Sequence, residues 1–230
     1  MNQAKNGAAE GFVAYADFQT AGRGRLDRQW EAPAGTSLLC SILLRAPVEP
    51  EELQLVVATV ALAARAALVR LSGVRPDLKW PNDLIVADKK LAGLLAEVVT
   101  TDEGLATVVG IGINLTHAGP DAVRATSILE ESGLTITSRA LLDILLFELE
   151  WRRALLDTRE GRAQIREEYE GALRTIGQRV RVELVGETVV GDAVGVDESG
   201  QLVVLVEDLR LTFSVGDVVH LRAHVRGSHE

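Results

Sequence analysis

Residues 74–99 read VRPDLKWPNDLIVADKKLAGLLAEVV, and their pattern indicates a run of β-strands. Residues 74–80 predict a strand, which Pro81 ends because proline lacks the N–H that a strand needs. Two apolar runs, residues 83–86 and 91–99, then predict the arms of a β-hairpin around a polar turn. A hairpin pairs its strands antiparallel, so this stretch favours an antiparallel sheet.

On either side of this stretch, apolar strands and amphipathic helices are expected. Proline and two acidic residues at 50–52 suit the first turn of a helix. Ser138 is expected to cap another helix, because its hydroxyl can accept a hydrogen bond from the first turn. The expected strands are 12–18, 36–44 and 106–115, the expected helices are 50–71, 139–156 and 160–173, and residues 19–30 and 116–137 are expected to be irregular.

The character of the sequence changes at Gly177, where short apolar runs alternate with glycine-containing turns. This spacing is typical of a small β barrel. We therefore expect two domains, residues 1–175 and residues 176–230. The expected strands of the second domain are 179–185, 188–196, 202–206, 209–213 and 218–221.

Composition restricts the classes of function. The chain has 230 residues, is 47% hydrophobic and carries a formal net charge of −9. Such an acidic chain lacks the basic surface of general nucleic-acid binders, so no nucleic-acid partner is expected. One cysteine, Cys40, excludes an internal disulfide and a cysteine-based zinc site. Residues 1–12 lack the apolar core of a signal peptide, and the apolar run 53–71 carries two arginines, so we expect a buried helix, no membrane partner and a cytoplasmic protein.

Cations gather in two short segments. Residues 22–28 hold three arginines, and three of the four lysines fall between positions 79 and 90. Arginines beside glycines indicate an anion site, because guanidinium groups bind carboxylate or phosphate bidentately. A solvated arginine-rich turn and a solubilising lysine hairpin tip are the plain alternatives. Common nucleotide signatures are missing: no Walker A loop, complete dinucleotide fingerprint or nucleophile elbow occurs.

The segment Lys79-Trp80-Pro81-Asn82-Asp83 follows a predicted strand. A carboxylate at this place could hold magnesium, which prefers one or two carboxylates together with phosphate oxygens. Proline, asparagine and aspartate are also ordinary turn residues, so the segment alone leaves both interpretations open.

Taken together, four motifs resemble one family. In chain order they are Gln19-Thr20-Ala21-Gly22-Arg23-Gly24-Arg25 with Arg28 and Trp30, Lys79-Trp80-Pro81-Asn82-Asp83, Lys90-Leu91-Ala92-Gly93, and Gly110-Ile111-Gly112-Ile113-Asn114. The chain resembles the biotin–protein ligases, also called biotin–[acetyl-CoA-carboxylase] ligases, over almost its whole length. The resemblance implies an α+β catalytic domain of the class II synthetase-like kind, with a mixed, mainly antiparallel sheet and packed helices, followed by an SH3-like barrel.

The resemblance also implies a reaction. Such ligases join biotin to ATP, giving biotinyl-5′-AMP and pyrophosphate, and then transfer biotin to a lysine of a biotin carboxyl carrier protein. Two anions must approach in the first step, so fixed cations and Mg²⁺ are expected rather than a covalent nucleophile. The expected partners are biotin, ATP and the carrier protein, and the chain is expected to be a monomer or a homodimer.

The same resemblance assigns the site residues. Arg25 and Lys90 are expected to act catalytically by straddling the biotin carboxylate and the α-phosphate, and Asp83 to bind the metal. The remaining alternatives are a core role for Trp30 and a turn-capping role for Asn114. The biotin-binding set is Gln19, Gly22, Arg23, Gly24, Arg25, Lys90 and Gly93, and the ATP-binding set is Arg23, Arg28, Trp30, Lys79, Asn82, Asp83 and Asn114.

The chain departs from the family pattern at its start. Family members carry an Asp-Ser-Thr-Asn segment whose hydroxyls bind the biotin ring, whereas this chain begins Met1-Asn2-Gln3. No helix-turn-helix region precedes the motifs, so a ligase without a repressor role is expected. Three alternatives stay open: a lipoate–protein ligase-like enzyme, a truncated biotin-binding protein without catalysis, and a purely structural module.

Overall fold

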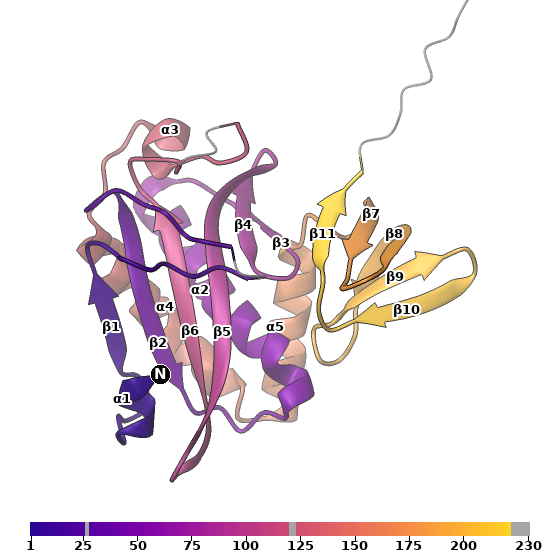
Figure 1. The fold of residues 1–230 in the computed structure, drawn as a ribbon, viewed down its shortest axis with the longest axis horizontal. Coiled ribbons are helices and arrows are strands. Elements are labelled where there is room, and N and C mark those ends of the chain that lie inside the picture. Colours follow the sequence, from indigo (N-terminus) through magenta and orange to yellow (C-terminus); the bar gives the residue numbers. More distant parts are fainter. Residues whose placement is uncertain (26–27, 120–122, 222–230) are drawn as a thin grey trace, which may run out of the picture.

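The computed structural model describes residues 1–25, 28–119 and 123–221. Its main body is a six-stranded sheet in the order β1-β2-β6-β5-β4-β3, and every neighbouring pair is antiparallel. The expected α+β class with a mainly antiparallel sheet is therefore confirmed (Figure 1). The strands are β1 (Val13–Ala16), β2 (Ser37–Leu44), β3 (Asp77–Lys79), β4 (Asp83–Val86), β5 (Lys89–Thr101) and β6 (Gly104–Asn114).

The hairpin that the sequence predicts is formed by β4 and β5. Its turn is tighter than expected, because Ala87 and Asp88 alone adopt left-handed backbone angles and β5 already begins at Lys89. The strand expected at 74–80 is confirmed only in its second half, since β3 covers residues 77–79. The Trp80–Pro81 peptide bond is cis.

One face of the sheet is covered by helices (Figure 1). The central helix α2 (Leu53–Ser72) follows the 3₁₀ turn η1 (Pro50–Glu52) and ends at Gly73, which has a φ of 73°. By length and apolar composition, residues 50–72 could cross a membrane, but 67% of that apolar window is buried inside the fold. Helix α2 packs against α4 (Ser138–Leu155) and α5 (Arg159–Ala172), so the expected buried core helix is confirmed.

Two details of the helices differ from expectation. The N-cap of α4 is Thr137, whose hydroxyl accepts from the Ala140 amide at 3.2 Å, so the cap predicted at Ser138 is wrong by one residue. Short helices also occupy segments where none was expected: α1 (Asn2–Lys5) and α3 (Ile128–Ser132). Helices of one turn carry too little periodicity for a pattern to reveal them.

The C-terminal segment folds into a five-stranded antiparallel sheet in the order β10-β9-β8-β7-β11. It lies beside α5 and β3 (Figure 1). Its inward side chains join the same hydrophobic cluster as the main sheet and helices. The strands are β7 (Arg179–Glu183), β8 (Thr188–Val196), β9 (Leu202–Val206), β10 (Leu209–Phe213) and β11 (Asp217–His220).

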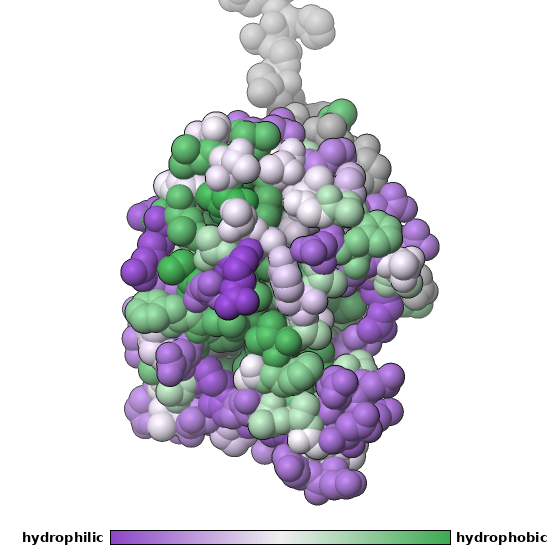
Figure 2. All heavy atoms as spheres, turned by 90° about the vertical axis from the view of Figure 1, so that its left-hand side faces the viewer, coloured by the Kyte–Doolittle hydropathy of each residue, from purple (hydrophilic) through white to green (hydrophobic). Residues whose placement is uncertain are grey.

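At the opposite edge of the main sheet, β1 is the last strand. The side of the molecule that carries it shows apolar side chains among charged ones (Figure 2). Phe12, Tyr15 and Phe18 are exposed along this edge. The sheet face that the helices leave uncovered carries the chemistry described next.

Candidate active site

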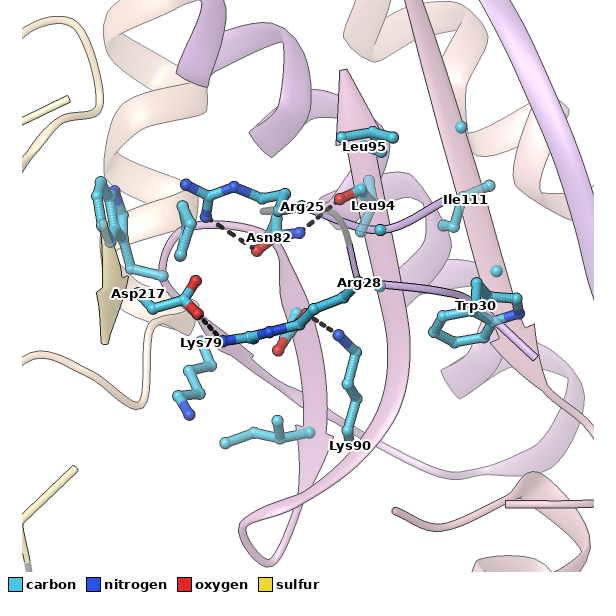
Figure 3. A pocket seen from close by; sticks show the side chains of 18 of the residues that line it. Arg25, Arg28, Trp30, Lys79, Asn82, Lys90, Leu94, Leu95, Ile111 and Asp217 are labelled. Carbon is cyan, nitrogen blue, oxygen red and sulfur yellow. Dashed lines mark hydrogen bonds and ion pairs between the residues drawn. The ribbon is translucent and has the colours of Figure 1, made fainter. Parts of the chain in front are cut away.

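A cleft of about 1070 Å³ lies between the open face of the main sheet, the arginine-containing segment before β2, and strand β11. It gathers residues from all four sequence motifs and from the C-terminal sheet (Figure 3). Predicted site residues that line it are Gln19, Arg23, Gly24, Arg25, Arg28, Trp30, Lys79, Asn82, Asp83, Lys90 and Gly93.

The three arginines of residues 22–28 have different partners. Arg23 forms a bidentate pair with Glu97 of β5, with nitrogen–oxygen distances of 2.8 and 2.5 Å. Arg28 reaches across to an ion pair with Asp217 of β11 (Figure 3). Arg25 is the least exposed of the three, and its guanidinium lies 3.4 Å from Asn82 Oδ1.

Arg25 is the most desolvated of these cations. Burial lowers its pKa from the ordinary arginine value, and the carboxylates of Asp217 and Asp83 partly oppose that shift. Arginine remains charged under all ordinary conditions, so the cleft contains a fixed, poorly hydrated positive charge. Such a charge is well placed to stabilise an anion that displaces the remaining water.

Strands β4 and β5 bring a cation and an anion together. Lys90 Nζ lies 2.6 Å from Asp83 Oδ1, and the pair is partly buried. Asn82 is fixed by its side-chain amide, which donates to the Leu94 carbonyl at 2.5 Å. The Lys-Trp-Pro-Asn-Asp segment and Lys90 therefore line one cleft, and the binding roles expected for them stay predictions.

Gly93 and Gly112 leave space for the indole ring of Trp30. A Cβ atom on Gly112 would lie 2.5 Å from the ring of Trp30, and one on Gly93 would lie 3.3 Å from it and 2.9 Å from the Lys90 chain. Lys90 Nζ lies 5.8 Å from the centroid of the same ring. Glycine at both positions lets Trp30 pack flat against strands β5 and β6.

Two predicted residues lie away from the cleft wall. Asn114 is buried, and its amide donates to the Thr126 carbonyl at 3.0 Å, so it holds a neighbouring loop rather than lining the cleft. Gly22 lines a smaller adjoining pocket together with Leu95 and Glu97. Adenine binding by Asn114 and biotin binding by Gly22 stay predictions.

The residues of the C-terminal sheet and Gly112 of β6 were assigned no role from the sequence. Arg181, Glu183, Asp217 and His220 line the cleft from the C-terminal side, and no local pattern marked them. Gly112 also lines it, and here a signal was present, since Gly110-Ile111-Gly112 interrupts an otherwise apolar strand. Cys40 lines the cleft as well, but burial raises its pKa to about 12, which leaves an unreactive thiol.

The donor set fits magnesium bound together with a nucleotide. Among the described residues no group of three or more His, Cys, Asp or Glu side chains could hold a metal by itself. The Asp83 carboxylate beside the Asn82 amide offers the one or two oxygen ligands that Mg²⁺ takes when phosphates supply the others.

Comparison with known proteins agrees with this geometry. Residues 3–114 match the biotin/lipoate A/B protein ligase family, and residues 175–221 match the biotin protein ligase C-terminal domain. The biotin–[acetyl-CoA-carboxylase] ligase of Mycobacterium tuberculosis is 38% identical over 96% of this chain and 84% of its own length. The chain belongs to the biotin–[acetyl-CoA-carboxylase] ligase family.

Solved structures of this ligase family share the fold. The biotin protein ligase of Aquifex aeolicus, in complex with biotin and ATP, superposes with a TM-score of 0.79 at 26% identity, covering 96% of this chain and 94% of that one. The enzyme of Leishmania major, in complex with biotinyl-5-AMP, superposes with a TM-score of 0.61 at 25% identity, covering 96% and 92%. The expected family and the SH3-like C-terminal unit are therefore confirmed.

Proposed function

We propose that this chain is an ATP-dependent biotin–protein ligase that uses biotin, ATP and Mg²⁺. The observation that carries the proposal is the placement of Arg25, Lys90, Asn82 and Asp83 in one cleft, in a chain that belongs to the biotin–[acetyl-CoA-carboxylase] ligase family. In the first step, a carboxylate oxygen of biotin attacks the α-phosphorus of ATP, and pyrophosphate leaves with its bonding electrons. In the second, the amine of a carrier lysine attacks the acyl carbon, AMP leaves, and the amine loses a proton.

The residues act by positioning and by neutralising charge. Arg25 and Lys90 bind the biotin carboxylate and the α-phosphate, which requires Lys90 to exchange its 2.6 Å partner Asp83 for the substrate. Asp83, once released, would hold Mg²⁺, and the bound metal would offset the charge of the phosphates. Burial around Arg25 reduces the water that would hydrolyse an acyl-adenylate.

The remaining assignments follow the same proposal. Gln19, Gly22, Arg23, Gly24 and Gly93 form the biotin side, and Arg28, Trp30, Lys79, Asn82 and Asn114 the nucleotide side. The acceptor is a biotin carboxyl carrier protein in the cytoplasm, residues 1–175 and 176–230 are the two domains, and the chain acts as a monomer or a homodimer.

Biotin-dependent exchange of labelled pyrophosphate into ATP tests the first step. The proposal predicts exchange with biotin and Mg²⁺ and much less with lipoate. Exchange that depends on lipoate instead would show that lipoate, not biotin, is the substrate. Both are considered because the biotin/lipoate A/B protein ligase family includes ligases for either one. Biotin binding without any exchange would show that the chain binds biotin but does not activate it.

A further inference from the structure

The last strand of the C-terminal sheet meets the Lys-Trp-Pro-Asn-Asp segment through one buried hydroxyl. Thr175 is fully buried, and its Oγ1 accepts a hydrogen bond from the Trp80 amide at 3.1 Å. His220, at the end of β11, places its Nε2 3.2 Å from the same oxygen. A side chain of the C-terminal sheet thus reaches the segment that carries Asn82 and Asp83 through a single intermediate.

The neighbouring backbone makes this contact a continuation of the main sheet. Arg174 N donates to the Leu78 carbonyl at 2.8 Å, and Leu78 forms a parallel bridge with Leu173. The Thr175 hydroxyl extends this pairing to Trp80, at the point where β3 has ended. The direction in which the chain leaves the sheet toward Asn82 is therefore fixed partly by Thr175.

The hydrogen-bond partners of Thr175 favour one state of the imidazole. Because the Thr175 oxygen accepts from Trp80, its own proton needs an acceptor, and His220 Nε2 is the partner that the described residues provide. Nε2 must then be unprotonated, with the ring proton on Nδ1. A protonated ring would turn Nε2 into a donor and leave the buried hydroxyl proton unpaired, at the cost of a lost hydrogen bond.

The charges that face His220 favour the same neutral state. Burial is the largest cause that lowers its pKa from the ordinary histidine value, and the cations Lys79 of β3 and Arg174 after α5 lower it further. Asp88, in the turn between β4 and β5, acts in the opposite direction. An added positive charge beside Lys79 and Arg174 would therefore be unfavourable.

We propose that His220 is a positioning residue of the ligase: as a neutral acceptor for Thr175, it fixes the Trp80 amide and thereby the placement of Lys79, Asn82 and Asp83 for ATP. This inference rests on the proposed ligase function and extends it to a side chain outside the four motifs. Because the folded pKa is lowered, the arrangement is intact above the unfolded histidine pKa of about 6.5 and is lost as pH falls through the lower folded pKa.

The test compares pH profiles of biotin-dependent ATP–pyrophosphate exchange from about pH 5 to 8, where histidine titrates. H220Q keeps an oxygen that can accept from Thr175 but cannot titrate, so most of the neutral-pH rate should remain and the acid limb due to His220 should disappear. H220L removes the acceptor and should lower kcat/KM for ATP by about tenfold at neutral pH, as for one unpaired buried group, with less effect on the KM for biotin.

Two further variants separate the loss of the His220–Thr175–Trp80 hydrogen bonds from a general loss of stability. T175V removes the hydroxyl at similar volume, so the double variant H220L/T175V should lose no more than the larger single loss. H117Q changes an exposed histidine of the loop after β6 and should keep the wild-type profile. The inference is overturned if H220Q keeps the full acid limb, or if H220L matches wild type.

A readout without catalysis keeps this inference apart from the proposed function. Nuclear magnetic resonance of ¹⁵N-labelled imidazoles in the full chain should show His220 protonated on Nδ1, with a pKa below the ordinary histidine value. Protonation on Nε2, or an ordinary pKa, would overturn the inference even in an active enzyme. Should wild type show no exchange at any pH, the proposed function fails and the imidazole measurement alone decides.

Discussion

Arg25 is distinguished from its neighbouring arginines by what surrounds it. Arg23 and Arg28 have protein carboxylates as bound partners, Glu97 and Asp217, whereas Arg25 faces the cleft with an amide oxygen as its hydrogen-bond acceptor. A desolvated cation gains most from an anionic ligand, because the interaction is poorly screened.

R25M should therefore abolish most catalysis while leaving the fold intact. We expect pyrophosphate exchange to fall at least about 100-fold, the loss typical of removing a group that stabilises transition-state charge. The melting temperature should change little, since a buried cation without a close carboxylate adds little stability. R139M changes an exposed arginine at the start of α4 and serves as the matched control. An R25M enzyme with wild-type exchange rates would remove Arg25 from the mechanism.

Gly112 should tolerate no side chain, whereas Gly110 on the same strand should. A Cβ at position 112 would lie 2.5 Å from the Trp30 ring, while one at position 110 would have its nearest neighbours at 3.6 Å. We expect G112A to lower the free energy of unfolding by about 1–3 kcal/mol, as overpacking does, and G110A by less. Urea titrations measure both, and equal effects would contradict the close packing of Trp30.

The sequence predicted the cleft residues better than their partners. Arg25, Lys90, Asn82 and Asp83 lie in short motifs, so their order and spacing identified them. Glu97 and Asp217 are ordinary surface-type acids in the sequence, and only the folded chain brings them to Arg23 and Arg28. The Asn114 amide donates to the Thr126 carbonyl, 12 residues further along the chain, a long-range contact that the type of residue alone could not reveal.

At the scale of elements, long periodic segments were predicted well and their ends less so. The helix of 20 residues, α2, is apolar along most of its length; it begins three residues later and ends one residue later than expected, since residues 50–52 form a 3₁₀ turn. The start of α4 was predicted one residue late, because Thr137 and Ser138 are both good cap residues. Tertiary contact decides between them: Ser138 Oγ lies 2.6 Å from the Tyr15 hydroxyl of β1, which leaves Thr137 to cap.

This assignment predicts different costs for two adjacent substitutions. T137A removes the acceptor for the Ala140 amide and should lower the free energy of unfolding by about 1 kcal/mol. S138A removes only an exposed contact with Tyr15 and should cost less than about 0.5 kcal/mol. Thermal or urea unfolding of the two variants compares these losses of stability. A larger loss for S138A would show that Ser138, not Thr137, caps α4.

At the scale of the whole molecule, two sequence segments share one core. The cluster of buried side chains runs from the main sheet through α2 and α5 into the C-terminal sheet, and Trp80 Nε1 donates to the Gly200 carbonyl at 3.3 Å. A change of sequence character at Gly177 predicts a separate domain, but the sequence pattern cannot show how much apolar surface the two parts bury against each other.

Shared packing predicts shared unfolding. Leu202 is fully buried in β9, so L202A should destabilise by about 2–5 kcal/mol and lower one common transition rather than melting the C-terminal sheet first. L209A, at a position 68% exposed on β10, is the control and should cost far less. Calorimetry that resolves two transitions in L202A, with the main sheet unaffected, would show two independent domains.

The most direct test of the proposed ligase activity is the intact mass of a carrier domain incubated with this protein, biotin, ATP and Mg²⁺. We predict that wild type adds one biotinyl group to the acceptor lysine, that R25M adds almost none, and that a carrier without this lysine stays unmodified. A carrier whose mass is unchanged, although the protein binds biotin and ATP, would contradict the assignment of this chain as a biotin–protein ligase.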